Sequence, residues 1–270
     1  MRAWFVSVLV AAACIGVPAT ALADDGSSSN WAGFAVHGTS FHRVVGLWRQ
    51  PGVTCNPGQA SYSAYWVGLG GYSGSALEQI GTEADCGANG QPQLTAWYEL
   101  VPAASMTVSL RINPGDMMEG VVTVTSHRAT LILRDLTRHR SFQVSPPVSQ
   151  VDVSSAEWIV EAPSDCSSTC VTLPLANFGS TAFIGARAEA GGHWGTISNP
   201  AWHATRISLS PSGAHTAGAQ GGPQGSAIPS ALSAGGTAFT VTFSPGGAAS
   251  MSLKRQALRA GRLVHPRAAR

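Results

Sequence analysis

Hydrophobic residues fall in short alternating runs along most of this chain. From Trp31 to Phe243 about a dozen such runs are separated by Gly, Pro, Asn or Asp. No segment keeps the i, i+3, i+4, i+7 spacing of an amphipathic helix, and no internal repeat is present. The pattern predicts one all-β domain, an antiparallel β-sandwich. The clearest runs are Val44–Trp48, Tyr62–Leu69, Leu94–Leu100, Met106–Ile112, Val121–Ser126, Thr130–Leu133, Trp158–Val160, Ala182–Ala186 and Ile207–Leu209.

Composition supports this fold class and excludes others. The 270 residues include 31 Gly and 16 Pro, and only 11% are charged, which is unlike a helical bundle or coiled coil. Because 44% of the residues are hydrophobic and eight are Trp, disorder throughout the chain is excluded. A net charge of +2 gives no sign of nucleic-acid binding, so we expect no nucleic-acid partner.

The first 23 residues have the pattern of a secretory signal. Arg2 is a charged start, Trp4–Val17 is apolar, and Ala21-Leu22-Ala23 is a cleavage site of the A-x-A type. The apolar run is too short for a comfortable transmembrane helix. The rival interpretation is a lipoprotein attached through Cys14, whose preceding alanines match that signal poorly. We predict a secreted monomer with no membrane attachment once the signal, residues 1–23, is removed.

Charge divides the remainder into two parts. Residues 24–245 carry 9 basic and 14 acidic groups and form the predicted domain. Residues 246–270 carry six basic groups and no acid, which predicts a basic, flexible C-terminal tail. A Gly-, Ala-, Ser- and Pro-rich stretch at 213–236 is expected to be a long loop before a final strand at Phe239–Phe243.

Four cysteines remain after the signal, an even number in an exported chain, so two disulfides are expected. Cys166 and Cys170 can close a small loop, which leaves Cys55 to pair with Cys86. No Cys-x-x-Cys pair or neighbouring His supports zinc, and the eight His residues form no ligand motif. We therefore expect no metal and no cofactor.

Familiar catalytic motifs are absent, but acids and amides recur among aromatic residues. There is no G-x-S-x-G elbow, no Gly-Asp-Ser-Gly nucleophile loop and no phosphate-binding loop. Six segments, in this order and spacing, resemble the glutamic peptidases (the eqolisins, peptidase family G1). They are Ser29–Gly33, Tyr65–Gly71, Leu77–Thr82, Ala96–Pro102, Pro114–Asp116 and Ala156–Glu161, and Leu173–Leu175 before Phe178 matches as well.

The resemblance implies both a fold and a catalytic pair. It implies two antiparallel, roughly seven-stranded sheets, similar to concanavalin-type lectins, and a secreted endopeptidase acting on protein or peptide substrates at acid pH. By motif, Gln79 and Glu161 are the catalytic residues. The residues expected to line or support the substrate cleft are Trp31, Trp66, Trp97, Tyr98 and Glu99.

Elementary chemistry agrees with this pair. A Glu carboxylate can take a proton from water and return it to the leaving amine. A Gln amide can donate a hydrogen bond to the oxyanion. Because side chains alternate along a strand, Leu77, Gln79 and Gly81 share one face. Glu161 likewise shares a face with Glu157, and Glu99 has the position to orient Gln79.

One departure from the family pattern and two rival functions must also be considered. Fungal relatives have an Asp where this chain has Gly70, so one polar contact to substrate is missing. A β-glucanase would pair Glu157 with Glu161, yet four extended residues span about 13 Å, too far for paired glycosidase carboxyls. A non-catalytic, lectin-like sandwich that binds sugars through aromatic side chains also fits the composition. Glu157 is expected to be a solvated strand acid.

Overall fold

The computed structural model describes residues 23–166, 170–210, 225–233 and 235–245, and within these ranges every regular element is a strand. No helix among the described residues is long and apolar enough to cross a membrane. The strands are β1 Asp24–Ser28, β2 Trp31–His37, β3 Phe41–Arg49, β4 Ala64–Gly70, β5 Leu77–Cys86, β6 Pro92–Val101, β7 Met106–Val108, β8 Met117–Thr125, β9 Arg128–Asp135, β10 Arg140–Val144, β11 Ser155–Glu161, β12 Ser164–Asp165, β13 Val171–Thr172, β14 Ser180–Ala190, β15 His193–Thr196, β16 His203–Leu209, β17 Ser226–Pro229 and β18 Phe239–Ser244.

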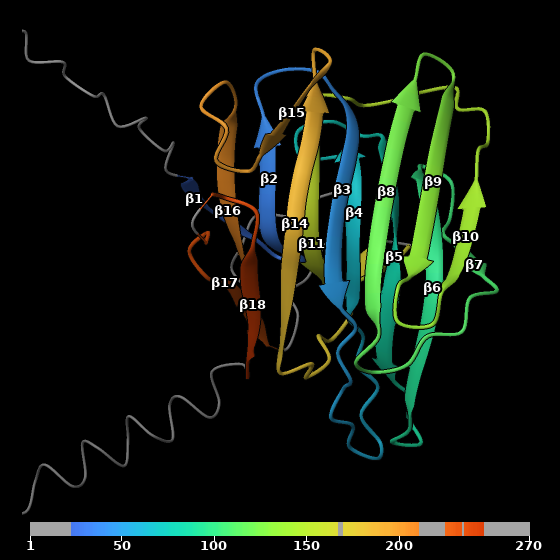
Figure 1. The fold of residues 1–270 in the computed structure, drawn as a ribbon. Helices are drawn as coiled ribbons and strands as arrows, with labels where there is room; N and C mark the ends of the chain where they lie inside the picture. Colours follow the sequence, from blue (N-terminus) through green and yellow to red (C-terminus); the bar gives the residue numbers. More distant parts are fainter. Residues whose placement is uncertain (1–22, 167–169, 211–224, 234, 246–270) are drawn as a thin grey trace, which may run out of the picture.

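The strands form two layers, which confirms the predicted sandwich (Figure 1). One hydrogen-bonded path runs β10-β9-β8-β3-β14-β18 and then β17-β16-β2-β11-β4-β5-β6-β7. The hydrogen-bonded path passes from one layer to the other at the antiparallel pair β17–β18, so it has six strands in one layer and eight in the other, close to the seven expected for each. Strand β1 extends one layer by pairing in parallel with β16, and β15 pairs with β14.

The main hydrophobic core fills the space between the layers. On β11, Ala156, Trp158 and Val160 face this core and are fully buried. The Trp158 indole nitrogen donates to the Val45 carbonyl of the opposite layer at 2.8 Å, which joins the two sheets. Gly46 must be glycine here, because a Cβ would lie 2.5 Å from the Trp158 ring.

A second apolar cluster covers the opposite, outer face of the layer that contains β2, β11, β4 and β5. It contains Trp31, Ala35, Ala64, Trp66, Leu77, Trp97, Ile159 and Ile207. Strands β2 and β4 are therefore buried on both faces along almost their whole length. This double burial provides a dry surface on which polar side chains can be held in fixed positions.

Both predicted disulfides are present. Cys55 bonds to Cys86 at the end of β5, and Cys166 bonds to Cys170. Residues 1–22 of the predicted signal at 1–23, the predicted tail at 246–270 and most of the predicted loop at 213–236 lie outside the described residues. The predicted domain boundaries therefore remain predictions.

Candidate active site

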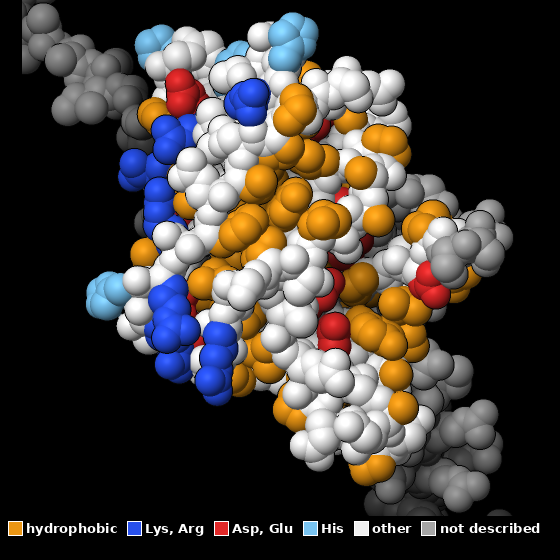
Figure 2. Space-filling view, turned by 90° about the vertical axis from the view of Figure 1, so that its right-hand side faces the viewer, with side chains coloured by type: hydrophobic (Ala, Val, Ile, Leu, Met, Phe, Trp, Pro, Cys, Tyr) orange, Lys and Arg blue, Asp and Glu red, His pale blue; other side chains and the backbone are white. Residues whose placement is uncertain are grey.

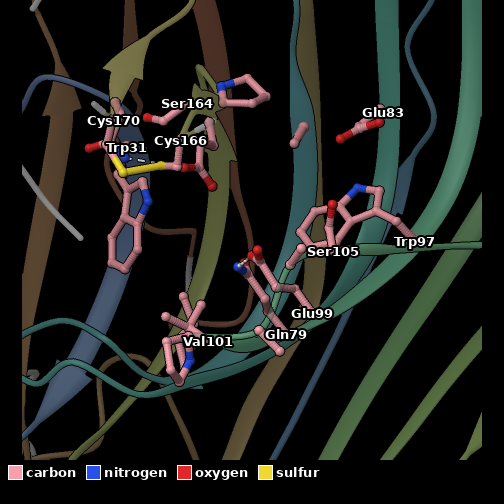
Figure 3. A pocket seen from close by; sticks show the side chains of 18 residues that line it. Trp31, Gln79, Glu83, Trp97, Glu99, Val101, Ser105, Ser164, Cys166 and Cys170 are labelled. Atoms are coloured by element: carbon pink, nitrogen blue, oxygen red, sulfur yellow. Dashed lines mark hydrogen bonds between the residues drawn. A yellow bond between two sulfur atoms is a disulfide. The ribbon is translucent and has the colours of Figure 1, made fainter. Parts of the chain in front are cut away.

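A cavity of about 480 Å³ opens on the outer face of the layer β2-β11-β4-β5-β6. Its walls come from these strands, from the turn after β6 and from the segment with the Cys166–Cys170 disulfide (Figure 3). Polar side chains that line it include Asn30, Gln79, Glu83, Glu99, Glu161 and Ser164. The cavity therefore brings together both residues of the predicted catalytic pair.

Gln79 is fixed by Glu99 from the neighbouring strand. The two residues are directly opposite each other in the β5–β6 register, and Gln79 Nε2 donates to Glu99 Oε2 at 2.6 Å (Figure 3). An amide nitrogen has two hydrogens, so one remains free to donate into the cavity. Gln79 is only 4% exposed, and its Oε1 has no hydrogen-bond partner among the described residues. The orienting role expected for Glu99 is consistent with this contact.

Glu161 is held at the end of β11 by two donors. Asn30 Nδ2 donates to Oε1 at 3.1 Å, and the Trp66 indole nitrogen donates to Oε2 at 2.8 Å. Burial, together with the nearby charge of Glu99, raises the pKa of Glu161 to about 8, against the lowering effect of its hydrogen bonds. The carboxyl is therefore protonated through the acidic range in the ligand-free protein.

Gln79 and Glu161 flank the cavity without contacting each other. Strand β4 lies between their strands, and Glu161 is in the cross-strand row of Ala64 and Glu83, not in the row of Gln79. The offset along the strands is four residues, about 13 Å, and the two strand spacings from β11 to β5 add a lateral separation of about 10 Å between the backbone positions. Both side chains are long and reach into the cavity, so a substrate group bound between them can meet both.

The predicted aromatic residues occupy three different environments. Trp31 and Trp97 line the cavity. Trp66 is fully buried, donates to Glu161 and packs edge-on against Trp31, with ring centroids 5.1 Å apart. Tyr98 is on the other face of β6, stacked on Phe142 with ring centroids 5.9 Å apart, so this structure places it away from the cavity.

Glu157 is not the solvated acid that we expected. It is 0% exposed, and neither carboxyl oxygen has a hydrogen-bond partner among the described residues. Burial raises its pKa well above the usual range. The sequence expectation was wrong because the outer face of β11 is covered by the second apolar cluster. Glu157 does not line the cavity, so it cannot pair with Glu161 as the β-glucanase interpretation requires.

Two residues that the sequence analysis did not single out as site residues also belong to this cavity. Asn30 holds Glu161, and Glu83 projects from β5 on the same face as Gln79. The sequence did contain a signal for Glu83: residues i and i+4 of a strand share one face, so Glu83 should face the same way as Gln79.

Basic side chains are absent from the strands around the cavity. Strands β2, β4, β5, β6 and β11 contain no Lys or Arg, whereas Arg residues occur on β3, β9, β10, β14 and β16. Figure 2 shows arginine side chains along one side of the molecule and acidic side chains among hydrophobic ones elsewhere. Within the described ranges, no three His, Cys, Asp or Glu side chains are grouped so that they could hold a metal ion.

Comparisons with known proteins agree with the motifs. The model of the Peptidase A4 family matches residues 29–222. Aspergillopepsin-2 of Aspergillus niger is 30% identical over 189 residues, covering 61% of this chain, and the chain spans 66% of that relative's length. The crystal structure of scytalido-glutamic peptidase with a transition state analog inhibitor covers 80% of this chain and 98% of its own, with 23% identity and a TM-score of 0.65.

Aspergilloglutamic peptidase from Aspergillus niger has a TM-score of 0.54 and 27% identity, and covers 68% of this chain and 99% of its own. The scytalido-glutamic peptidase structure supports the fold, while the family match rests on the sequence. The chain therefore belongs to the Peptidase A4 family, the glutamic peptidases whose motifs its sequence carries.

Proposed function

We propose that this protein is a secreted endopeptidase that hydrolyses peptide bonds at acid pH with Gln79 and Glu161. The observation that carries the proposal is their shared cavity: each residue comes from a different strand, and each is held by its own hydrogen bonds. Family membership supports peptide-bond hydrolysis as the reaction. The proposed mechanism uses side chains alone, without a metal or cofactor.

Glu161 acts twice in this mechanism. Its ionised carboxylate takes a proton from a water molecule, and the water oxygen forms a bond to the carbonyl carbon of the substrate. The carboxyl then returns that proton to the amide nitrogen, so the C–N bond breaks and an amine leaves. Asn30 and Trp66 keep the carboxyl in position for both steps.

Gln79 stabilises the charge that develops on the carbonyl oxygen. Its free Nε2 hydrogen donates to the oxyanion, while Glu99 accepts the other hydrogen and fixes the direction of the amide. A well-placed donor of this kind contributes about 3–4 kcal/mol to the transition state. Because Glu99 accepts from Nε2, the amide cannot turn over and present its oxygen to the oxyanion.

The pKa of about 8 for Glu161 sets a condition on action at acid pH. In the free enzyme the ionised fraction falls tenfold for each pH unit below that value. Action in the acidic range therefore requires bound substrate to lower the pKa of Glu161. The pH dependence of kcat/KM reports the free enzyme and that of kcat reports the complex, so comparing them measures this shift.

Two observations support the remaining parts of the proposal. A solved eqolisin was crystallised with the tripeptide Ala-Ile-His, and scytalido-glutamic peptidase with a peptide-based transition state analog, which favours a peptide substrate for this chain. The Cys55–Cys86 disulfide is typical of proteins from an oxidising compartment, as export requires.

Cleavage of a denatured protein at acid pH tests the proposal. The wild-type chain should cleave it in the presence of EDTA, pepstatin or serine-directed reagents. Gln79→Ala and Glu161→Gln should lose cleavage, whereas Gln143→Ala and Glu189→Gln, matched changes on the other layer, should retain it. Complete loss with EDTA, or full activity of Glu161→Gln, would refute the proposed mechanism. A wild-type chain that binds sugars and cleaves no protein would indicate a lectin-like module.

A further inference from the structure

Glu83 is a third carboxylate in the cavity that the proposed reaction does not use. In the strand registers it lies opposite Ala64, and Ala64 lies opposite Glu161. The two carboxylate-bearing residues are therefore two strands apart, about 10 Å between backbone positions. Only the small side chain of Ala64 stands between them, which leaves the space open.

The hydrogen bonding of Glu83 leaves one oxygen available. Thr95 Oγ1 donates to Glu83 Oε2 at 2.8 Å and so fixes the carboxyl against the neighbouring strand. No other described residue donates to this carboxyl. Nor do Lys, Arg or His side chains line the described cavity. A negative charge at Glu83 is therefore not compensated by the protein itself.

Trp97 gives an independent indication of a ligand beside Glu83. It is 5% exposed, and its indole nitrogen has no hydrogen-bond partner among the described residues. Glu83 and Trp97 are diagonal neighbours in the β5–β6 register and lie along one wall of the cavity (Figure 3). A buried donor without an acceptor is costly, so an acceptor on the ligand would relieve this cost.

These features match one chemical group on a peptide. A lysine or arginine side chain provides a cation for Glu83 and an apolar stem or guanidinium plane for the Trp97 ring. The backbone carbonyl of the same residue provides an acceptor for an indole N–H. A metal ion fits less well, because the described acids do not form a group that could hold one.

We infer that Glu83 is a specificity-determining residue, which binds a lysine or arginine side chain of the peptide near the bond to be cleaved. This inference rests on the proposed function, since it assigns a subsite in the same cavity. Glu83 lies in the cross-strand row of Glu161, so the cation it binds belongs to a residue close to the scissile bond.

Binding and cleavage are measured separately with two peptides that differ only by lysine or norleucine at one residue beside the scissile bond. Binding is measured at pH 6 in the Glu161→Gln background, where the peptides stay intact. There the lysine peptide should bind about tenfold more tightly than the norleucine peptide. Adding Glu83→Gln should abolish this ratio, because Gln can still accept from Thr95 but carries no charge.

Two further variants make the result specific. Glu83→Asp keeps the charge and should retain most of the preference for lysine. Glu189→Gln removes an acid from the other layer and should leave the ratio unchanged. In the chain with Glu161 intact, the ratio of kcat/KM values for the two peptides should fall about tenfold on Glu83→Gln.

The outcomes separate this inference from the proposed function. If wild-type protein cleaves neither peptide, the proposed function fails, while the binding ratio still tests Glu83. If both peptides bind equally before Glu83 is changed, or if Glu83→Gln weakens both equally, the inference is wrong.

Discussion

Raising the pH should destabilise this fold, and Glu78 offers the cleanest way to measure the effect. Its side chain is 1% exposed, and one carboxyl oxygen has no hydrogen-bond partner among the described residues. Burial raises its pKa from 4.5 to about 8, and the charge of Asp152 contributes in the same direction. The folded protein therefore holds a proton that the unfolded chain releases near pH 4.5.

The sign follows from proton linkage. Between pH 4.5 and 8 the folded state binds more protons than the unfolded state, so the free energy of unfolding falls as pH rises. One group contributes a slope of about 1.4 kcal/mol per pH unit in this interval. Over the whole interval Glu78 would account for up to about 5 kcal/mol, a large part of the 5–15 kcal/mol typical of a domain. Glu157 and Glu161 act in the same direction.

Urea unfolding at pH 5, 6, 7 and 8 measures this dependence, with linear extrapolation to water at each pH. In Glu78→Gln the slope of stability against pH should be shallower than in wild type by about 1.4 kcal/mol per unit. Glu189→Gln, which removes an acid from the other layer, should keep the wild-type slope. An unchanged slope in Glu78→Gln would refute the reasoning, because Glu78 would then ionise in the folded state without cost.

Three other predictions concern catalysis and folding. Gln79→Ala should lower kcat by about 10²–10³ in a peptide-cleavage assay, since it removes the oxyanion donor; a change below threefold would exclude that role. If Glu161 is the base, kcat/KM should rise with pH to a midpoint at about 8, and the midpoint of the kcat profile should lie at least two pH units lower. A kcat/KM that falls across pH 4–6 would indicate that the protonated form of Glu161 is the active one. Replacing Cys55 and Cys86 by Ala should cost about 4 kcal/mol of unfolding free energy, from their separation of 31 residues; urea unfolding that shows a cost under 1 kcal/mol would contradict it.

The family motifs pointed to Gln79 and Glu161, and strand alternation predicted which face of its strand each side chain occupies. Gln79 and Glu161 do face a common cavity, and both cysteine pairs are as expected. The alternation could not reveal that the outer face of β11 is itself buried. The residues that cover it, such as Trp31 and Ile207, are distant in sequence, and only the order of the strands brings them together.

The same limit explains the outcome for Tyr98 and Glu83. A motif of consecutive residues on a strand contains side chains of both faces, so Trp97 and Glu99 reach the cavity while Tyr98 packs on Phe142. Glu83 lies outside the recognised motif, and its place opposite Ala64 depends on the register of β4 with β5.

A crystal structure with a peptide analogue of the tetrahedral intermediate tests the central claim most directly. Gln79 Nε2 should lie 2.7–3.1 Å from the oxygen that replaces the oxyanion, as expected for an oxyanion donor. Glu161 should lie within hydrogen-bond distance of the oxygen that replaces the attacking water. An analogue bound with its tetrahedral centre away from either residue would contradict the assignment of Gln79 and Glu161 as the catalytic pair.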